Sequence, residues 1–290
     1  MNRLIVVFNS KSSRSIIAQR EISEKARKLP GFLVGKYEVL PTNVDDNALK
    51  LSKILQDGDL VVAVGGDATA SIGMNGCLLS EKDVVFSALS FGNFGDVAHY
   101  FGNLEFSEVI ERFGRKETRE FYPIDVRVDG EHFRYAAGYA TVGMMAESVE
   151  IFNQEKNRNK MKKKKRTEFS SYRWLAKWYF KNRKKEFLPN NVSDYFAING
   201  KNIARIMKGG DFGFSQEFQS GEYKLAGFFS LCWFMARAIL SHIYGEKKKK
   251  DELVFSEKRA LTIQMEGESK DFVCQKIEFL KNKTIKVISK

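Results

Sequence analysis

Residues 60–64 (LVVAV) run directly into residues 65–69 (GGDAT), and this junction decides the fold class. A short β-branched apolar run that ends at glycines is typical of a buried strand. Two adjacent glycines allow positive φ angles and let a ligand approach the backbone without meeting a Cβ atom. Asp67 would then lie at the carboxyl end of a strand, where open α/β sheets bind their ligands. A strand-to-helix turn with Asp67 as the N-cap explains the same residues equally well.

Two further junctions favour a ligand site over a plain turn. Residues 84–89 (VVFSAL) are followed by glycines and an acid in residues 90–98 (SFGNFGDVA). Residues 4–8 (LIVVF) are followed by a lysine and hydroxyl groups in residues 9–13 (NSKSS). Backbone N–H groups, hydroxyls and lysines in such loops are suited to phosphate. Three phosphate-compatible strand ends in one half of the chain are more than turn chemistry alone predicts.

The first part of the chain alternates between strand and helix patterns. Strands are predicted at residues 4–8, 36–40, 60–64 and 84–89. Helices are predicted at residues 15–29, 46–55 and 106–113. This alternation predicts an α/β domain with a mostly parallel sheet that is covered on both faces.

From residue 122 onward the pattern changes to short alternating segments. Asp129 with Gly130, and Asn199 with Gly200, are hairpin turn signals. Strands are predicted at residues 124–128, 133–139, 195–198, 203–207, 224–231, 260–265 and 273–279. This second part is therefore predicted to be a mainly antiparallel β domain.

Three ordered motifs resemble the diacylglycerol kinase catalytic domain superfamily. They are Asn-x-Lys-Ser from Asn9, Gly-Gly-Asp-x-Thr from Gly65, and Gly-x-x-x-Asp-x-Ala from Gly92. Residues 138–147 resemble the family's glycine-rich strand, and residues 264–268 (QMEGE) its late Asp-Gly-Glu segment. The superfamily includes bacterial lipid kinases and sphingosine kinases and, more distantly, NAD kinases.

The resemblance implies two domains. A Rossmann-like nucleotide-binding domain is expected over residues 1–121, with a return of residues 281–290. A β-sandwich domain for the lipid substrate is expected over residues 122–280, with a basic, aromatic insertion at residues 151–190.

The resemblance also implies the site residues and the cofactors, which are ATP and Mg²⁺. Asp67 and Glu268 are the expected catalytic carboxylates. The expected nucleotide-binding residues are Asn9, Lys11, Ser12, Gly65, Gly66, Thr69, Gly92, Asn93 and Asp96. No metal ligand set is assigned.

Several positions depart from the family pattern. Ala68 replaces a glycine, which would cost of order 1 kcal/mol if that position needs a positive φ. The loop at residues 92–96 (GNFGD) has lost the usual threonine and asparagine positions. Residues 219–222 (QSGE) lack both aspartates of a structural magnesium segment that some bacterial members carry. A degenerate, non-catalytic nucleotide- or lipid-binding relative is therefore an alternative.

Composition narrows the class of protein. The 290 residues are 43% hydrophobic, enough to bury a core in two domains. Three cysteines and three histidines are scattered, which argues against a disulfide framework, a zinc site or a histidine-based nucleophile. No signal-peptide pattern is found, and the longest apolar stretch, residues 225–243, contains Arg237, which disfavours a membrane span. We expect a cytoplasmic protein.

The insertion at residues 151–190 holds most of the charge. It carries net +11 of the chain's formal +12, interleaved with aromatic residues. A basic amphipathic segment with tryptophan and tyrosine is typical of a membrane-surface element. The predicted membrane-binding residues are Lys162, Lys163, Lys164, Lys165, Arg166, Trp174 and Trp178. Packing of the aromatics with solvated lysines is the plain alternative, and nucleic acid is disfavoured because no nucleic-acid fold signature accompanies the charge.

The predicted function is phosphoryl transfer from ATP to a lipid hydroxyl, diacylglycerol-like, at the inner face of the membrane. The expected partners are the lipid substrate and an anionic membrane surface, and a homodimer stays open. A soluble kinase of NAD kinase type and a polyanion-binding protein are the remaining alternatives. The basic aromatic insertion speaks against the soluble kinase.

Overall fold

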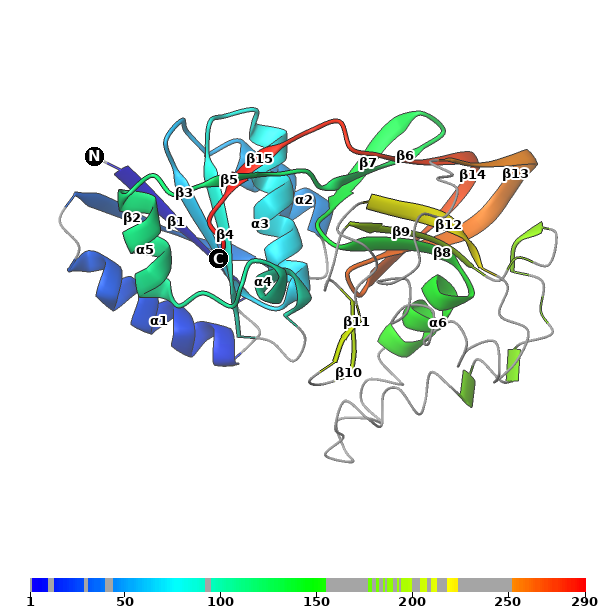
Figure 1. Ribbon diagram of the computed structural model, residues 1–290, viewed down its shortest axis with the longest axis horizontal. Coiled ribbons are helices and arrows are strands. Elements are labelled where there is room, and N and C mark those ends of the chain that lie inside the picture. The colour runs from blue at the N-terminus through cyan, green and yellow to red at the C-terminus, as the bar shows by residue number, and fades with distance from the viewer. Residues whose placement is uncertain are drawn as a thin grey trace. The chain divides into compact units, whose positions relative to one another are not determined.

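The chain divides into two compact units in a computed structural model (Figure 1). Unit 1 is Met1–Pro123 with Lys281–Lys290, and unit 2 is Ile124–Leu280. The residues that the structure describes are 2–9, 13–28, 31–39, 44–91, 95–154, 177–178, 181–182, 185, 187–189, 192, 194–199, 204–207, 210–212, 218–223 and 252–290. Each unit is described by itself below.

Unit 1 is an α/β domain built on one six-stranded sheet. Its elements are β1 (Asn2–Asn9), α1 (Ser13–Arg27), β2 (Phe32–Val39), α2 (Val44–Ser52), β3 (Leu60–Gly65), α3 (Asp67–Ser80), β4 (Val85–Ser90), α4 (Asp96–Tyr100), α5 (Phe106–Gly114), β5 (Arg119–Phe121) and β15 (Ile285–Val287). The strand order is β2-β1-β3-β4-β15-β5. Pairing is parallel from β2 to β15, and β5 pairs antiparallel with β15.

Helices cover both faces of this sheet, with α1 and α5 on one face and α2 and α3 on the other (Figure 1). Ala18, Ile22 and Ala26 recur every four residues along α1 and are buried against the strands. On the other face, α3 packs closely against the sheet and against α2 because it carries glycines where they meet. A Cβ atom on Gly73 would lie 2.8 Å from the Phe86 ring, and one on Gly76 would lie 2.6 Å from Leu51 of α2.

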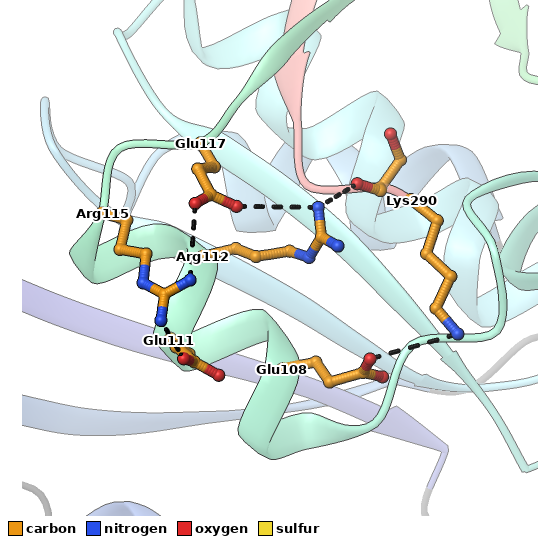
Figure 2. Close-up of polar contacts among 7 residues, drawn as sticks. Glu108, Glu111, Arg112, Arg115, Glu117 and Lys290 are labelled. Carbon is orange, nitrogen blue, oxygen red and sulfur yellow. Dashed lines mark hydrogen bonds and ion pairs between the residues drawn. The ribbon is translucent and has the colours of Figure 1, made fainter.

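The last residues of the chain are fastened to α5 within unit 1 (Figure 2). Arg112 donates to the backbone oxygen of Ser289 at 3.1 Å and lies 3.7 Å from Glu117. Lys290 pairs with Glu108 across 4.0 Å. These exposed pairs contribute little individually, so the burial of Ile285, Val287 and Ile288 is the main anchor of this segment.

Unit 2 is a mainly antiparallel β domain. Its elements are β6 (Ile124–Val128), β7 (Glu131–Ala136), β8 (Tyr139–Gly143), α6 (Met144–Asn153), β9 (Asp194–Asn199), β10 (Ala204–Met207), β11 (Gly210–Phe212), β12 (Phe218–Tyr223), β13 (Glu252–Met265) and β14 (Glu268–Leu280). A seven-stranded sheet has the order β12-β9-β8-β13-β14-β6-β7, and β10 pairs with β11. Its core is a separate cluster that includes Tyr195, Ile263, Ile277 and Phe279.

The predicted fold class is confirmed. A mostly parallel α/β unit is followed by an antiparallel β unit. The hairpin turn expected at Asp129 and Gly130 joins β6 to β7, with φ angles of 51° and 86°.

Three local predictions differ from the structure. The strand expected at residues 133–139 is interrupted, because β7 ends at Ala136 and β8 begins at Tyr139. The strand expected at 138–147 ends at Gly143, where the good helix formers of α6 begin. Asn199 does not begin a hairpin between paired strands, because β9 pairs with β8 and β12. The predicted strand at 224–231 lies outside the described residues.

Candidate functional site

The strand order of the unit 1 sheet creates a topological switch point between β1 and β3. The edge of the sheet that matters for ligand binding is the one formed by the carboxyl ends of its parallel strands. From β1 the chain passes to β2 on one side, and β3 and β4 follow on the other side. In open α/β sheets the crevice at the carboxyl ends of such a strand pair is where ligands bind. Asn9 ends β1 and Gly65 ends β3, with Phe8 and Val64 in register just before them. Both predicted residues therefore lie at this edge.

The two glycines after β3 allow a tight passage into α3. A Cβ atom on the buried Gly65 would lie 2.6 Å from Oγ1 of Thr69, so the position has no room for a side chain. The backbone oxygen of Gly66 accepts from Thr69 at 3.0 Å and Ala70 at 3.1 Å, which begins the helix. The first-turn N–H groups of α3 lie at the positive end of the helix dipole. A helix start of this kind binds phosphate groups.

Asp67 is the first residue of α3 and is half-buried. The N-cap is Gly66, so the interpretation of Asp67 as the N-cap is wrong. Its Oδ1 instead accepts from the backbone nitrogen of Val97 at 3.1 Å. This hydrogen bond ties the β3–α3 junction to the start of α4. The carboxylate lies where it stabilises the helix dipole and where it could contact a cation held by phosphates.

Ala68 is helical. It lies in α3 and is absent from the residues with positive φ. The strain expected if this position needed a positive φ therefore does not arise. The replacement of glycine by alanine leaves the start of α3 regular.

The third predicted loop is only partly described. Asp96 is the first residue of α4, and Gly95 before it is buried, with Ser90 Oγ only 2.1 Å from where a Cβ would lie. Gly95 therefore has no room for a side chain where its backbone lies against Ser90 at the end of β4. The remaining predicted phosphate residues, Lys11, Ser12, Gly92 and Asn93, lie outside the described residues.

In unit 2 the predicted carboxylate Glu268 is the first residue of β14 and is partly buried. It follows a two-residue turn, Glu266 and Gly267, with φ angles of 51° and 85°. Sequence reasoning assigned no role to Glu266, although it is only 5% exposed. A glutamate at a hairpin position where glycine, asparagine or aspartate is preferred was the available signal.

A second buried acid holds the start of α6. Asp194 is fully buried, and its Oδ1 accepts from the backbone nitrogen of Met145 at 2.6 Å. Its Oδ2 has no hydrogen-bond partner among the described residues. Burial raises the pKa of Asp194 to about 7, with a smaller contribution from the charge of Glu147.

Sequence reasoning also missed a charged cluster on β6 and β7. Asp125 is 1% exposed and accepts from Nε of Arg127 at 2.9 Å. Its other oxygen lies 2.6 Å from Nδ1 of His132, whose ring contacts Tyr135. The histidines were dismissed because they are scattered in sequence, whereas pairing of β6 with β7 brings this one to a buried carboxylate. An aspartate among apolar strand residues was the signal.

The basic insertion is mostly outside the described residues. Lys162, Lys163, Lys164, Lys165, Arg166 and Trp174 fall there. Trp178 is half-buried, 6.0 Å from the Phe187 ring, and its backbone oxygen accepts from Asn182. Both contacts lie within the insertion itself, so the membrane-binding role expected of Trp178 stays a prediction. Among the helices that the structure describes, none is long and apolar enough to cross a bilayer.

Comparison with known proteins agrees with the geometry of unit 1. Residues 3–126 match the model of the diacylglycerol kinase catalytic domain, a span that contains the β1, β3 and β4 junctions. The resemblance to that superfamily is confirmed. Unit 1 is thus similar to the catalytic domain of this family.

One solved structure supports the fold over the whole chain, and a second is reported for comparison. A diacylglycerol kinase from Bacillus anthracis str. Sterne is 11% identical, with a TM-score of 0.56 covering 100% of this chain and 96% of that one. An NAD kinase from Archaeoglobus fulgidus, solved in complex with ATP, is 11% identical with a TM-score of 0.42, covering 100% and 94%. Among curated proteins, none matches the chain in sequence.

Proposed function

We propose that this protein is a lipid kinase that transfers a phosphoryl group from ATP, with Mg²⁺, to the hydroxyl of a diacylglycerol-like lipid. The observation that carries the proposal is the junction after β3. There a glycine pair, a helix start and Asp67 meet at the switch point of the sheet, inside the span that matches the catalytic domain family.

The described residues suit a nucleotide with one magnesium ion. The first turn of α3 offers N–H groups to phosphate oxygens, and Asp67 offers one carboxylate to the metal. Among the described residues, no three His, Cys, Asp or Glu side chains cluster to hold a metal by themselves. Mg²⁺ binds through one or two carboxylates together with substrate phosphates and neutralises charge on the transferring group.

The other predicted residues of unit 1 take roles around this edge. Asn9, Lys11 and Ser12 would contact the phosphates, and Gly92, Asn93 and Asp96 would form the next wall of the nucleotide site. Glu268 would act on the lipid hydroxyl as the second carboxylate. Phosphoryl transfer needs mainly positioning and charge neutralisation, which such a set of loops supplies.

The proposal includes action at an anionic membrane surface. Residues 162–166 (KKKKR) supply five charges in a row, each worth about 1 kcal/mol near an anionic leaflet. Replacing Lys162, Lys163, Lys164 and Lys165 by glutamine should weaken binding to phosphatidylserine vesicles by at least about tenfold. Vesicle binding that stays unchanged across a salt series would remove this run from membrane association.

The experiment that tests the kinase proposal is ATP consumption with Mg²⁺ across a panel of lipid alcohols in anionic mixed micelles. Asp67→Asn should abolish turnover while preserving the fold, because asparagine keeps an acceptor for Val97 but loses the charge. Asp83→Asn is the matched control, since Asp83 is exposed and pairs with Lys286 just before β4, at the other end of that strand. Wild-type rates in Asp67→Asn would remove it from the mechanism.

The same assay separates the alternatives. Turnover of a polar acceptor without micelles would point to a soluble kinase. ATP binding without turnover of any acceptor would point to a non-catalytic relative.

A further inference from the structure

The turn before Glu268 contains an unusual residue. Glu266 and Gly267 form a two-residue hairpin turn with positive φ at both positions, between the paired residues Met265 and Glu268. Glycine, asparagine and aspartate are favoured at the first position of such a turn because they tolerate that conformation. Glu266 nevertheless adopts φ 51° and is 5% exposed. Local turn chemistry therefore does not account for this glutamate.

A contact far along the chain does account for it. Oε1 of Glu266 accepts a hydrogen bond from the backbone nitrogen of Gly138 at 2.8 Å. Gly138 lies between the end of β7 and the start of β8. A buried carboxylate that bonds to a backbone N–H makes a charge-assisted hydrogen bond of the stronger kind. This bond joins the β13–β14 turn to the β7–β8 connection.

The β7–β8 connection is held from a second side. The backbone nitrogen of Asn199 donates to the oxygen of Gly138 at 2.7 Å. Its side-chain amide donates to the oxygen of Ala137 at 3.0 Å. Asn199 is buried at the end of β9. Two buried side chains, Asn199 of β9 and Glu266 of the β13–β14 turn, therefore hold one short connection.

Further buried polar contacts extend this arrangement along β8. Thr141 donates to Oε1 of Gln264 at 2.8 Å, and the Gln264 amide lies 3.4 Å from the Tyr139 hydroxyl. Gln264 is 3% exposed and Thr141 is 3% exposed. Buried polar networks with satisfied members specify one arrangement of the backbone. The end of the β13–β14 hairpin is therefore fixed to β8.

We propose that Glu266 is a positioning residue for Glu268. The inference rests on the proposed function, in which Glu268 acts on the lipid hydroxyl. Glu268 follows Glu266 by two residues across the turn. The hydrogen bond of Glu266 to Gly138 therefore fixes the backbone position from which the Glu268 side chain extends. The length of the glutamate side chain carries its carboxylate to Gly138, whereas aspartate and asparagine suit the turn but are one methylene shorter.

The test compares Glu266→Ala, Glu266→Gln and Glu266→Asn. Steady-state kinetics with the lipid alcohol and hydrogen–deuterium exchange of peptides covering residues 137–139 and 264–268 are measured on each full-length variant. Glu131→Ala is the matched control, because Glu131 is an exposed glutamate that follows the Asp129 turn.

The expected result is a graded loss. Glu266→Ala and Glu266→Asn should lower kcat by about 10- to 100-fold with little change in the KM for ATP, and should raise exchange in both peptides. Glu266→Gln should keep most of kcat and protection, because its amide oxygen can still accept from Gly138. Glu131→Ala should match the wild type.

Two results would overturn the inference. One is wild-type kcat in Glu266→Ala, and the other is unchanged exchange at residues 137–139 in that variant. If the wild-type protein phosphorylates no lipid alcohol, the proposed function fails separately. The exchange data then decide whether Glu266 joins the two connections.

Discussion

The two candidate carboxylates of this chain are held by different means. Asp67 in unit 1 is placed by backbone geometry, at a glycine pair where a buried strand becomes a helix. Glu268 in unit 2 is placed beside a turn whose anchor, Gly138, is 128 residues away in sequence. The first arrangement depends on the absence of a Cβ atom at Gly65. The second depends on the hydrogen bond that the buried Glu266 accepts from the backbone nitrogen of Gly138. Different substitutions should therefore disturb the two regions.

Buried acids recur around β8 in unit 2. Glu266 bonds to the backbone just before β8, and Asp194 bonds to Met145 just after it. Both ends of one strand are thus held by carboxylates that accept from backbone N–H groups. Of these two acids, Asp194 has a raised pKa, which predicts that the stability of unit 2 depends on pH.

The largest expected effect is on stability in Asp194→Asn. The pKa of Asp194 is raised from 3.8 to about 7, so the native state binds more protons than the unfolded state between these values. The free energy of unfolding should therefore fall as pH rises from about 4 to about 7. Asparagine keeps the acceptor for Met145 without a charge, and it should be more stable than the wild type at pH 8, by at most about 4 kcal/mol.

Urea unfolding at pH 5 and pH 8 checks this prediction. The difference in free energy of unfolding between Asp194→Asn and the wild type should grow from the lower to the higher pH. A difference that is the same at both values would show that Asp194 does not carry the pH dependence.

The next largest effect is expected in unit 1, where a side chain is introduced at the junction after β3. In Gly65→Ala the new Cβ would lie 2.6 Å from Oγ1 and 2.9 Å from Cβ of Thr69. Thr69 is buried and β-branched, so it has few rotamers in which to give way. The variant should lose about 1–3 kcal/mol of stability and should bind ATP more weakly.

Gly114→Ala is the matched control, because a Cβ there meets nothing within 4 Å. Thermal unfolding and ATP titration calorimetry of both variants give the comparison. Equal behaviour of the two alanine variants would mean that the junction after β3 tolerates a side chain.

The contrast also explains what sequence could predict. The edge of unit 1 was predictable because its signals are local, with residues 60–69 carrying the strand, the glycines and the acid together. The parallel strand order then follows from the alternation of strands and helices. The division after Pro123 lies two residues from the boundary expected after residue 121.

The arrangement in unit 2 could not be predicted in the same way. The partners of Glu266, Asp194 and Asp125 depend on which antiparallel strands pair, and pairing across long separations leaves no local pattern. Residues 138–147 show the same limit, because their glycines suggested a strand throughout while α6 begins at Met144. An acidic residue within an otherwise apolar strand is the local signal that predicts a buried acid with a distant partner.

The smallest expected effect concerns the residue that departs from the family pattern at the edge of unit 1. Ala68 is helical, so Ala68→Gly should lower the free energy of unfolding by about 0.5–1 kcal/mol, because glycine loses more backbone entropy in a helix. If residue 68 instead required positive φ, as the glycine of the family pattern could suggest, the same change would stabilise the protein. Urea unfolding of Ala68→Gly separates these signs. Because the helical backbone at residue 68 decides the effect, we expect the free energy of unfolding to fall in Ala68→Gly.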